Sequence, residues 1–276
     1  MNGKRWMALL LALVMSFSLF ACGAKPAENT GDNSQNTAAD GTTRVFTDSC
    51  GREVTVPVNV EKIAVSGPLA QIVVFAMAPD KLVGIANAWD ESAAEFLDKK
   101  YYNLPILGQL YGGKGELNLE TLLAAAPDVV IDVGEPKGSI VEDMDELQEQ
   151  TGIPFVHIDA YLSSMDDTYA MLGDLLAMPN EAQGRADYCR FAYDRIVSIA
   201  DSVDKVNLLY ITGDEGLNVI AQGSFHAEVI DLLSNNLAVV DEQGNRQRGG
   251  HGTDPQLEPR CDPVCPGQHL RHRGRQ

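Results

Sequence analysis

Cysteine and histidine residues gather near the C-terminus at a spacing that could hold a metal ion. Cys261, Cys265, His269 and His272 form the pattern Cys-x3-Cys-x3-His-x2-His, and two cysteines with two histidines are a common tetrahedral zinc set. Only three residues separate the two pairs, whereas a zinc finger places about 12 residues between them. We therefore expect no zinc at these residues and no metal site elsewhere in the chain.

A glycine-rich stretch at residues 108–115 nearly matches the phosphate-binding P-loop. It reads Gly-Gln-Leu-Tyr-Gly-Gly-Lys-Gly. The match fails at Gly115, where a P-loop has the Ser or Thr that holds magnesium, and no continuous helix opens there. We interpret the stretch as a surface loop at the rim of a cleft, in which Tyr111 could stack on a ligand. The sequence offers no nucleophile–base set, no paired catalytic carboxylates and no His-Glu-x-x-His motif.

The charge of the chain excludes one class of partner. The 276 residues carry a formal net charge of −18 at pH 7, and 36 of the 39 Asp and Glu lie before residue 244. Nucleic-acid binding needs a basic footprint on the protein, so we expect no nucleic-acid partner. An acidic domain is compatible with a position near an anionic membrane, to which it would not adhere.

The first 21 residues have the pattern of a secretion signal. Two basic residues precede an almost wholly apolar run from 7 to 20, which is shorter than the ~20 residues of a membrane-spanning helix. The run ends in Leu-Phe-Ala-Cys22, typical of a bacterial lipoprotein cleavage box in which the Cys22 thiol receives a lipid anchor. An ordinary signal peptide with a chance cysteine is the alternative. Residues 22–43 hold no large apolar side chain and are expected to form a flexible tether.

Strand and helix patterns alternate through the centre of the chain, which is typical of βαβ units with a mostly parallel sheet. Asn118 is expected to cap one of the helices. We expect strands at Ile63–Val65, Leu82–Ala86, Val129–Val133 and Phe155–Ile158, and helices at Ala70–Ala78, Ser92–Lys99, Leu119–Ala126, Ser139–Gln150 and Met165–Met178.

A longer helical pattern leads from this part into a second α/β pattern. Asn180 is expected to cap a helix that runs to about Val203. After it we expect strands at Val206–Thr212, Leu217–Ala221 and Leu237–Val240, and a helix at Ala227–Leu233.

Several polar and aromatic residues follow the expected strands, and open α/β sheets bind ligands at the carboxyl ends of their strands. Simple loop packing is the alternative for each of them. His157 lies inside an expected strand, and we expect it to be packed there. The candidate cleft residues are Ser66, Gly67, Pro68, Trp89, Tyr111, Lys137, Tyr161, Phe225 and His226.

Residues 44–63 predict a β-hairpin and carry a family resemblance. They read Arg-Val-Phe-Thr-Asp-Ser-Cys-Gly-Arg-Glu-Val-Thr-Val-Pro-Val-Asn-Val-Glu-Lys-Ile, with a turn in which Gly51 suits a positive φ. This stretch resembles the opening signature of the substrate-binding proteins of ATP-driven importers for iron–siderophore complexes, haem and cobalamin. Residues 223–234, Gly-Ser-Phe-His-Ala-Glu-Val-Ile-Asp-Leu-Leu-Ser, resemble a loop that lines the cleft in that family. The resemblance covers roughly residues 44–243.

The resemblance implies an α/β fold class in which a long rigid helix joins two Rossmann-like lobes. The expected domains are a signal peptide at 1–21, a tether at 22–43, an N-terminal lobe at 44–179, a connecting helix at 180–203, a partial C-terminal lobe at 204–245 and an aberrant tail at 246–276.

The resemblance also implies a function and its partners. We expect a monomer without enzymatic activity or resident cofactor, lipid-anchored on the outer face of the cytoplasmic membrane of a Gram-positive cell. It would deliver an iron complex, such as a ferric siderophore, to the permease and ATPase of an ABC importer. Lys137 is the one obvious cation for an anionic siderophore. Haem or cobalamin is the alternative cargo, and Tyr161 and His226 could bind haem iron.

Glu120 has two interpretations. In the family that the chain resembles, the matching Glu pairs with Arg residues of the permease. A first-turn acid that stabilises the helix dipole is the alternative. The alternative class for the whole protein is a lipoprotein α/β enzyme or a metal-dependent redox module, which would need convergent titrating groups in a cleft.

The last 31 residues differ in composition from the rest, with six Arg and no Lys from Arg246 to Gln276. Residues 251–266 can be translated back into codons, with the third bases chosen to suit. When these codons are read one base later, they give Met-Glu-Gln-Ile-Leu-Asn-Trp-Asn-Pro-Asp-Val-Ile-Leu. This string places Glu seven residues before Pro-Asp-Val, as Glu120 stands before Pro127. We therefore expect a shifted reading frame, a disordered tail and an incomplete C-terminal lobe.

Overall fold

The structure is a computed structural model of the chain, and it describes residues 41–111, 116–213 and 216–239. The expected signal at 1–21, the acylated Cys22, the tether up to residue 40 and the tail at 246–276 lie outside these residues. So do the second half of the glycine-rich stretch and the Cys and His pattern near the C-terminus.

The expected opening hairpin is confirmed. β1 (Thr43–Thr47) pairs with β2 (Glu53–Pro57) in antiparallel register. Gly51 in the turn has a φ of +77°, which glycine adopts without steric cost. Val54 and Val56 are buried and Thr55 between them is exposed, so one face of the hairpin contributes to the core.

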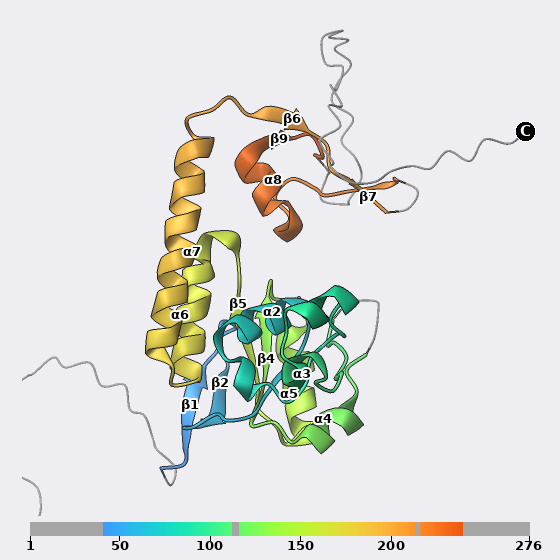
Figure 1. The fold of residues 1–276 in the computed structure, drawn as a ribbon, viewed down its shortest axis with the longest axis vertical. Helices are drawn as coiled ribbons and strands as arrows, with labels where there is room; N and C mark the ends of the chain where they lie inside the picture. Colours follow the sequence, from blue (N-terminus) through green and yellow to red (C-terminus); the bar gives the residue numbers. More distant parts are fainter. Residues whose placement is uncertain (1–40, 112–115, 214–215, 240–276) are drawn as a thin grey trace, which may run out of the picture. The chain divides into compact units, whose positions relative to one another are not determined.

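A three-stranded parallel sheet has the order β3–β4–β5, and Figure 1 labels β4 and β5 among the helices that surround them. Its strands are β3 (Ile63–Val65), β4 (Val129–Gly134) and β5 (Phe155–Asp159). Every residue of β3 and β4 is buried, as in parallel strands covered on both faces. Three of the four strands expected in this part are thus confirmed.

Helices cover both faces of the sheet because successive side chains of each strand point to opposite faces. Val65, Ile131 and Ile158 point into one core with α2 (Pro68–Met77). Ala64, Val130 and Phe155 point into a second core. The helices of this second core are α4 (Leu119–Ala125), which Asn118 caps as expected by accepting from Thr121 N, and α5 (Ile140–Thr151).

Helices α6 (Met165–Leu175) and α7 (Pro179–Ala200) lie side by side (Figure 1). The buried face of α7 includes Ala182 and Ala186. The expected cap at Asn180 is wrong, because α7 begins at Pro179, whose fixed φ and missing N–H suit a first helical position. The helix also ends at Ala200 rather than at Val203.

Two expected elements of the central part are wrong. Residues 82–86 form only isolated bridges, Ile63 to Leu82 and Ile85 to Ile106, instead of a continuous strand. The expected helix at Ser92–Lys99 is divided into the 3₁₀ helix η2 (Glu91–Glu95) and α3 (Lys99–Tyr102). Asp90 and Asp98 each accept a hydrogen bond from a backbone N–H two residues on, so each starts a separate turn.

The C-terminal pattern forms smaller elements than expected. The expected strand at 206–212 is divided, because β6 (Val206–Leu208) pairs with β9 (Ser234–Asn236) while β7 (Ile211–Thr212) pairs with β8 (Asn218–Val219). The strand expected at Leu237–Val240 lies earlier in the chain, as β9. Helix α8 (Glu228–Leu233) ends directly before Ser234, and the three residues that follow it pair with β6. The expected helix at Ala227–Leu233 begins as the 3₁₀ helix η4 (Phe225–Ala227).

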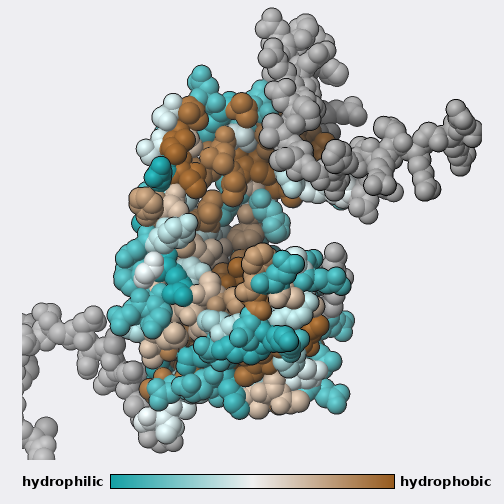
Figure 2. Space-filling view, in the orientation of Figure 1, coloured by the Kyte–Doolittle hydropathy of each residue, from teal (hydrophilic) through white to brown (hydrophobic). Residues whose placement is uncertain are grey.

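Exposed apolar side chains concentrate in this C-terminal part. Of the 18 large apolar side chains exposed in the described residues, 11 lie between Ile196 and Val239. Figure 2 shows hydrophobic residues gathered on the surface around α8 and the end of α7. Monomeric proteins rarely expose contiguous apolar surface of this kind, so the part from 206 to 239 is less fully packed than the sheet region.

Candidate functional site

A row of polar side chains crosses the sheet at the carboxyl ends of its strands. Asp132 and His157 are direct partners in the parallel register of β4 and β5, and Ser66 follows the last pair of β3 and β4. Each stands two positions after an apolar residue of the second core, so the three share one face. The Ser66 hydroxyl donates to Oδ1 of Asp132, and Nδ1 of His157 lies 2.7 Å from Oδ2 of Asp132.

His157 contacts a second carboxylate through its other ring nitrogen. Its Nε2 lies 3.0 Å from Oδ1 of Asp159, the last residue of β5. The His157 side chain has no exposed surface, whereas the Asp159 side chain is 40% exposed. Burial lowers the pKa of His157, but the hydrogen bonds and charges of Asp132 and Asp159 outweigh it, so the net pKa lies above its ordinary value.

The turn of the opening hairpin packs against this row. Asp48 Oδ2 accepts from the backbone N–H of His157 and from Arg52 Nη1, at 3.3 and 3.0 Å. The Ser49 hydroxyl donates a hydrogen bond to a sulfur, that of Met171, and accepts one from the backbone N–H of Asp159. The hairpin is therefore bound to the carboxyl end of β5 through both side chains and backbone.

The candidate residues after β3 lead directly into α2. Gly67 occupies the N-cap position of α2 and Pro68 is its first residue. Ser66 is buried, and its hydroxyl is bonded to Asp132. Its carbonyl accepts from Leu110 N at 2.7 Å, which brings the segment of Tyr111 to the same end of the sheet.

The other candidates of the sheet region have partners of their own. The Tyr111 hydroxyl donates to Asp143, and burial together with this hydrogen bond raises its pKa. Lys137 lies 3.5 Å from Glu135. The Trp89 ring meets Phe75 edge-on at 5.2 Å, and its Nε1 donates to the carbonyl of Tyr101.

The candidate Tyr161 meets the adjacent candidates Phe225 and His226 from a distant part of the sequence. The Tyr161 ring lies 5.7 Å from that of Phe225, which lies 5.5 Å from that of His226. Partial burial, followed by the charges of Asp159, Glu135 and Glu228, raises the pKa of Tyr161. The aromatic group therefore stands among carboxylates.

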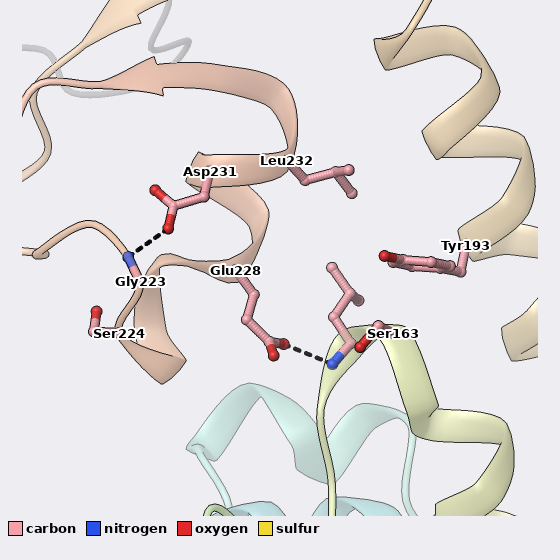
Figure 3. A pocket seen from close by; sticks show the side chains of 8 residues that line it. Ser163, Tyr193, Gly223, Ser224, Glu228, Asp231 and Leu232 are labelled. Carbon is pink, nitrogen blue, oxygen red and sulfur yellow. Dashed lines mark hydrogen bonds between the residues drawn. The ribbon is translucent and has the colours of Figure 1, made fainter.

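A pocket of about 310 Å³ is lined by residues that include Leu162 and Ser224, the sequence neighbours of Tyr161 and Phe225. Figure 3 shows Tyr193 of α7 and Leu232 of α8 on opposite sides of it, with Ser163 at one edge and Asp231 turned toward Gly223. Glu228 of α8 accepts a hydrogen bond of 2.6 Å from the backbone N–H of Leu162, and Asp231 accepts from Gly223 N. The lining combines hydroxyl, carboxylate and leucine side chains, so it can hold a small polar molecule. Its residues are Leu162, Ser163, Tyr193, Gly223, Ser224, Glu228, Asp231 and Leu232.

Glu120 is exposed in the first turn of α4. This position is compatible both with a stabilising contact to the helix dipole and with contact to another protein.

Sequence reasoning missed most of the charged residues that the structure brings together. The expectation that His157 is packed is confirmed, since it has no exposed surface. Asp48, Asp132 and Asp159 were not singled out. The signal was present for Asp132, a lone charged residue in the apolar strand Val-Val-Ile-Asp-Val, because a buried charge requires a partner.

Two general properties of the described residues bear on function. None of their His, Cys, Asp and Glu side chains form a group of three or more that could hold a metal ion. None of the helices among them combines the length and the apolar character that crossing a bilayer requires.

Solved structures with this fold bind solutes for transport. An ABC transporter solute-binding protein from Sulfurospirillum deleyianum is 24% identical, with a TM-score of 0.63 over 71% of this chain and 64% of that protein. The vitamin B12 binding protein BtuF of Vibrio cholerae is 21% identical, with a TM-score of 0.53 over 67% and 69%. The heme binding protein HmuT is 18% identical, with a TM-score of 0.51 over 77% and 69%.

The fold is thus that of ABC transporter solute-binding proteins, a mixed α/β fold with a parallel sheet. This chain spans less than two thirds of the length of the Sulfurospirillum protein. No protein-family model and no curated protein matches the sequence.

Proposed function

We propose that the chain is an extracytoplasmic solute-binding protein that hands a small ligand to the permease and ATPase of an ABC importer. The observation that carries the proposal is the fold likeness to transport solute-binding proteins. The candidate ligand residues at the carboxyl ends of the strands support it, because open α/β sheets bind ligands there. An enzymatic role has less support, since the proteins with this fold named above bind and carry solutes.

The cargo that we propose is an iron complex without large negative charge. Lys137, the cation expected to attract an anionic siderophore, has Glu135 as its neighbour. Three carboxylates also raise the pKa of Tyr161 by their charge, after the effect of burial: Asp159, Glu135 and Glu228. An anionic chelate would meet repulsion at this place, whereas a neutral or cationic ferric siderophore would not.

Haem is the second candidate cargo. The edge contacts among Tyr161, Phe225 and His226 favour it, because a flat macrocycle packs well against aromatic rings. Tyr161 and His226 are both chemically able to bind its iron.

Calorimetric titration of residues 41–276 tests the function and separates the cargoes. The probes are a cationic ferric hydroxamate, an anionic ferric catecholate, haemin and cyanocobalamin. We expect saturable binding of the hydroxamate or haemin and at least tenfold weaker binding of the catecholate. Binding of none of the four, together with turnover of a substrate in an activity screen, would replace the transport proposal by an enzymatic one.

We further propose that Cys22 carries a lipid anchor and that Glu120 contacts the permease. Labelled fatty acid is expected to enter the wild type and Cys50→Ser but not Cys22→Ser.

Glu120→Arg is expected to reduce uptake in cells while leaving cargo affinity unchanged. The control is Glu181→Arg, which changes an exposed acid in the first turn of α7. Equal labelling of all three proteins, or equal uptake by both Arg variants, would count against the respective proposal.

A further inference from the structure

The contacts of His157 require a proton that a neutral imidazole does not supply. A neutral ring has one N–H donor and one acceptor nitrogen. Both nitrogens of His157 face carboxylate oxygens, at 2.7 Å and 3.0 Å. When both carboxyl groups are ionised, one nitrogen lone pair of the neutral ring would oppose an oxygen lone pair, whereas the imidazolium donates to both carboxylates.

Other charged groups around His157 are already engaged with one another. On the hairpin, Asp48 pairs with Arg52, and the Arg52 guanidinium also reaches Asp145 of α5. Burial, followed by the charges of Asp48 and Asp159, raises the pKa of the nearby Cys50 thiol, which favours its uncharged form. Tyr111 donates its hydroxyl to Asp143 of α5. His157 is therefore the residue whose ring contacts both Asp132 and Asp159, and protonation would make it their cation.

The two carboxylates are attached to segments that lead into the candidate ligand surface. Asp132 holds the Ser66 hydroxyl directly before Gly67 and Pro68. Asp159 ends β5 two residues before Tyr161, and its carbonyl accepts from Thr168 Oγ1 of α6. The His157 ring thus contacts carboxylates of β4 and β5, and Asp132 extends this network to Ser66, which follows β3.

We propose that His157 is a buried imidazolium that positions the segments following β3 and β5, so that a rise in pH which removes its proton loosens the ligand-binding edge of the sheet. His157 is a positioning residue in this scheme, because its buried ring is not among the residues that line the pocket described above. The claim that these segments bind a ligand rests on the proposed function. The proton and its effect on the two segments do not.

The direction of the pH effect follows from the raised pKa of His157. Stabilisation by the imidazolium is complete below the unfolded pKa of about 6.5 and is lost as pH rises through the higher folded pKa. When the proton leaves, the ring keeps one donor, and the two carboxylates lose one compensating positive charge. Asp159 is expected to separate first, because its half-exposed side chain can turn to water, whereas Asp132 is nearly buried.

Nitrogen NMR of histidine-labelled protein tests the protonation state. The chain has five histidines, and His157→Gln identifies the signals of His157. Both ring nitrogens of His157 are expected to keep their protons to a higher pH than the exposed histidines do. Loss of the proton from His157 at the same pH as from the exposed histidines, or at a lower pH, would overturn the proposal.

Hydrogen exchange tests the positioning role. After correction for intrinsic rates, residues 66–71 and 159–164 of the wild type are expected to exchange at least tenfold faster at pH 9 than at pH 6. His157→Gln is expected to exchange fast at both pH values, and the control Lys99→Gln, which changes an exposed cation of α3, is expected to behave as the wild type. Equal exchange at the two pH values in the wild type would contradict the positioning role.

A second variant covers the case in which His157→Gln does not fold. Asp159→Asn removes one of the two carboxylates, so the midpoint of the exchange change is expected to move about one pH unit or more lower. An unchanged midpoint would contradict the proposal. A failure of all four probe ligands to bind would affect only the proposed function, since these readouts need no ligand.

Discussion

Arg52 shows how one side chain can hold three parts of the fold together. Its guanidinium donates to the Asp48 carboxylate, to the Phe155 carbonyl of β5 and to Asp145 of α5. The Asp48 side chain has no exposed surface and the Arg52 side chain is 9% exposed. Removing the guanidinium would therefore leave a buried carboxylate without its cation.

We expect Arg52→Met to lower the free energy of unfolding by about 3–5 kcal/mol, the range for breaking a buried ion pair. Urea unfolding followed by circular dichroism measures the change. Arg195→Met on the exposed surface of α7 is the control and is expected to stay within about 0.5 kcal/mol of the wild type. Equal losses in the two variants would show that the buried pair has no special weight.

At the residue scale, the sequence predicts apolar positions better than polar partnerships. The alternation of Val54 and Val56 predicts their burial because a strand has a fixed period of two. The contact of His157 with Asp132 depends on the register of two parallel strands, which no local pattern determines. The ring contact of Tyr161 with Phe225 joins residues far apart in the sequence and was also beyond local reasoning.

Helices α6 and α7 illustrate how a single missing side chain permits close packing. Gly173 of α6 is buried, and a Cβ at its position would overlap the Cβ of Ala182 in α7. A Cβ at Gly184 of α7 would meet only open space. The two glycines therefore provide a matched pair within one helical hairpin.

Gly173→Ala is expected to destabilise the protein by about 1–3 kcal/mol through overpacking. Gly184→Ala is expected to stabilise it by about 0.5–1 kcal/mol, because alanine loses less conformational freedom in a helix. Thermal unfolding of both variants measures the difference. Stabilisation by both substitutions would mean that α6 and α7 separate without cost.

At the element scale, long periodic segments were predictable and short ones were not. α5 and the bodies of α6 and α7 follow the expected ranges because several turns of helix repeat the same pattern. The expected end of α6 at Met178 is wrong, because the helix ends at Leu175 and Ala177 has a φ of +53°. The prediction of one helix at residues 92–99 is wrong because two aspartates start separate turns. The prediction of one strand at residues 206–212 is wrong because β6 and β7 within this segment pair with different strands.

The apolar cores of the described residues lie in one part of the chain. All buried members of both cores fall between Phe46 and Ala186. The part from 206 to 239 contacts the sheet region through the hydrogen bond of Glu228 with Leu162 and the rings of Tyr161 and Phe225. The stability of the molecule is therefore concentrated before residue 200.

A fragment of residues 41–200 is expected to keep a cooperative thermal transition, with a Tm within about 8 °C of the longer protein. The reason is that the lost hydrogen bond and the lost ring contact cost about 1 kcal/mol each, and each kcal/mol shifts Tm by about 2–4 °C in a chain of this size. Calorimetry of both proteins measures it. A fragment of residues 41–175 is the control and is expected to lose the transition, because it lacks the buried face of α7. Loss of the transition in both fragments would show that residues after 200 complete the core.

The edge contacts of Trp89 give the described part of the chain an internal optical reporter. Its indole meets the ring of Phe75 at 5.2 Å, and that ring meets Tyr101 at 5.3 Å. Light absorbed by Tyr101 can therefore pass to Trp89, and the asymmetric surroundings of the indole give it a near-ultraviolet dichroism signal. Phe75 belongs to α2, which begins at Pro68. Any displacement of α2 would therefore change the emission wavelength of Trp89, even if the ligand that causes it lies at the end of β3 and does not contact the indole.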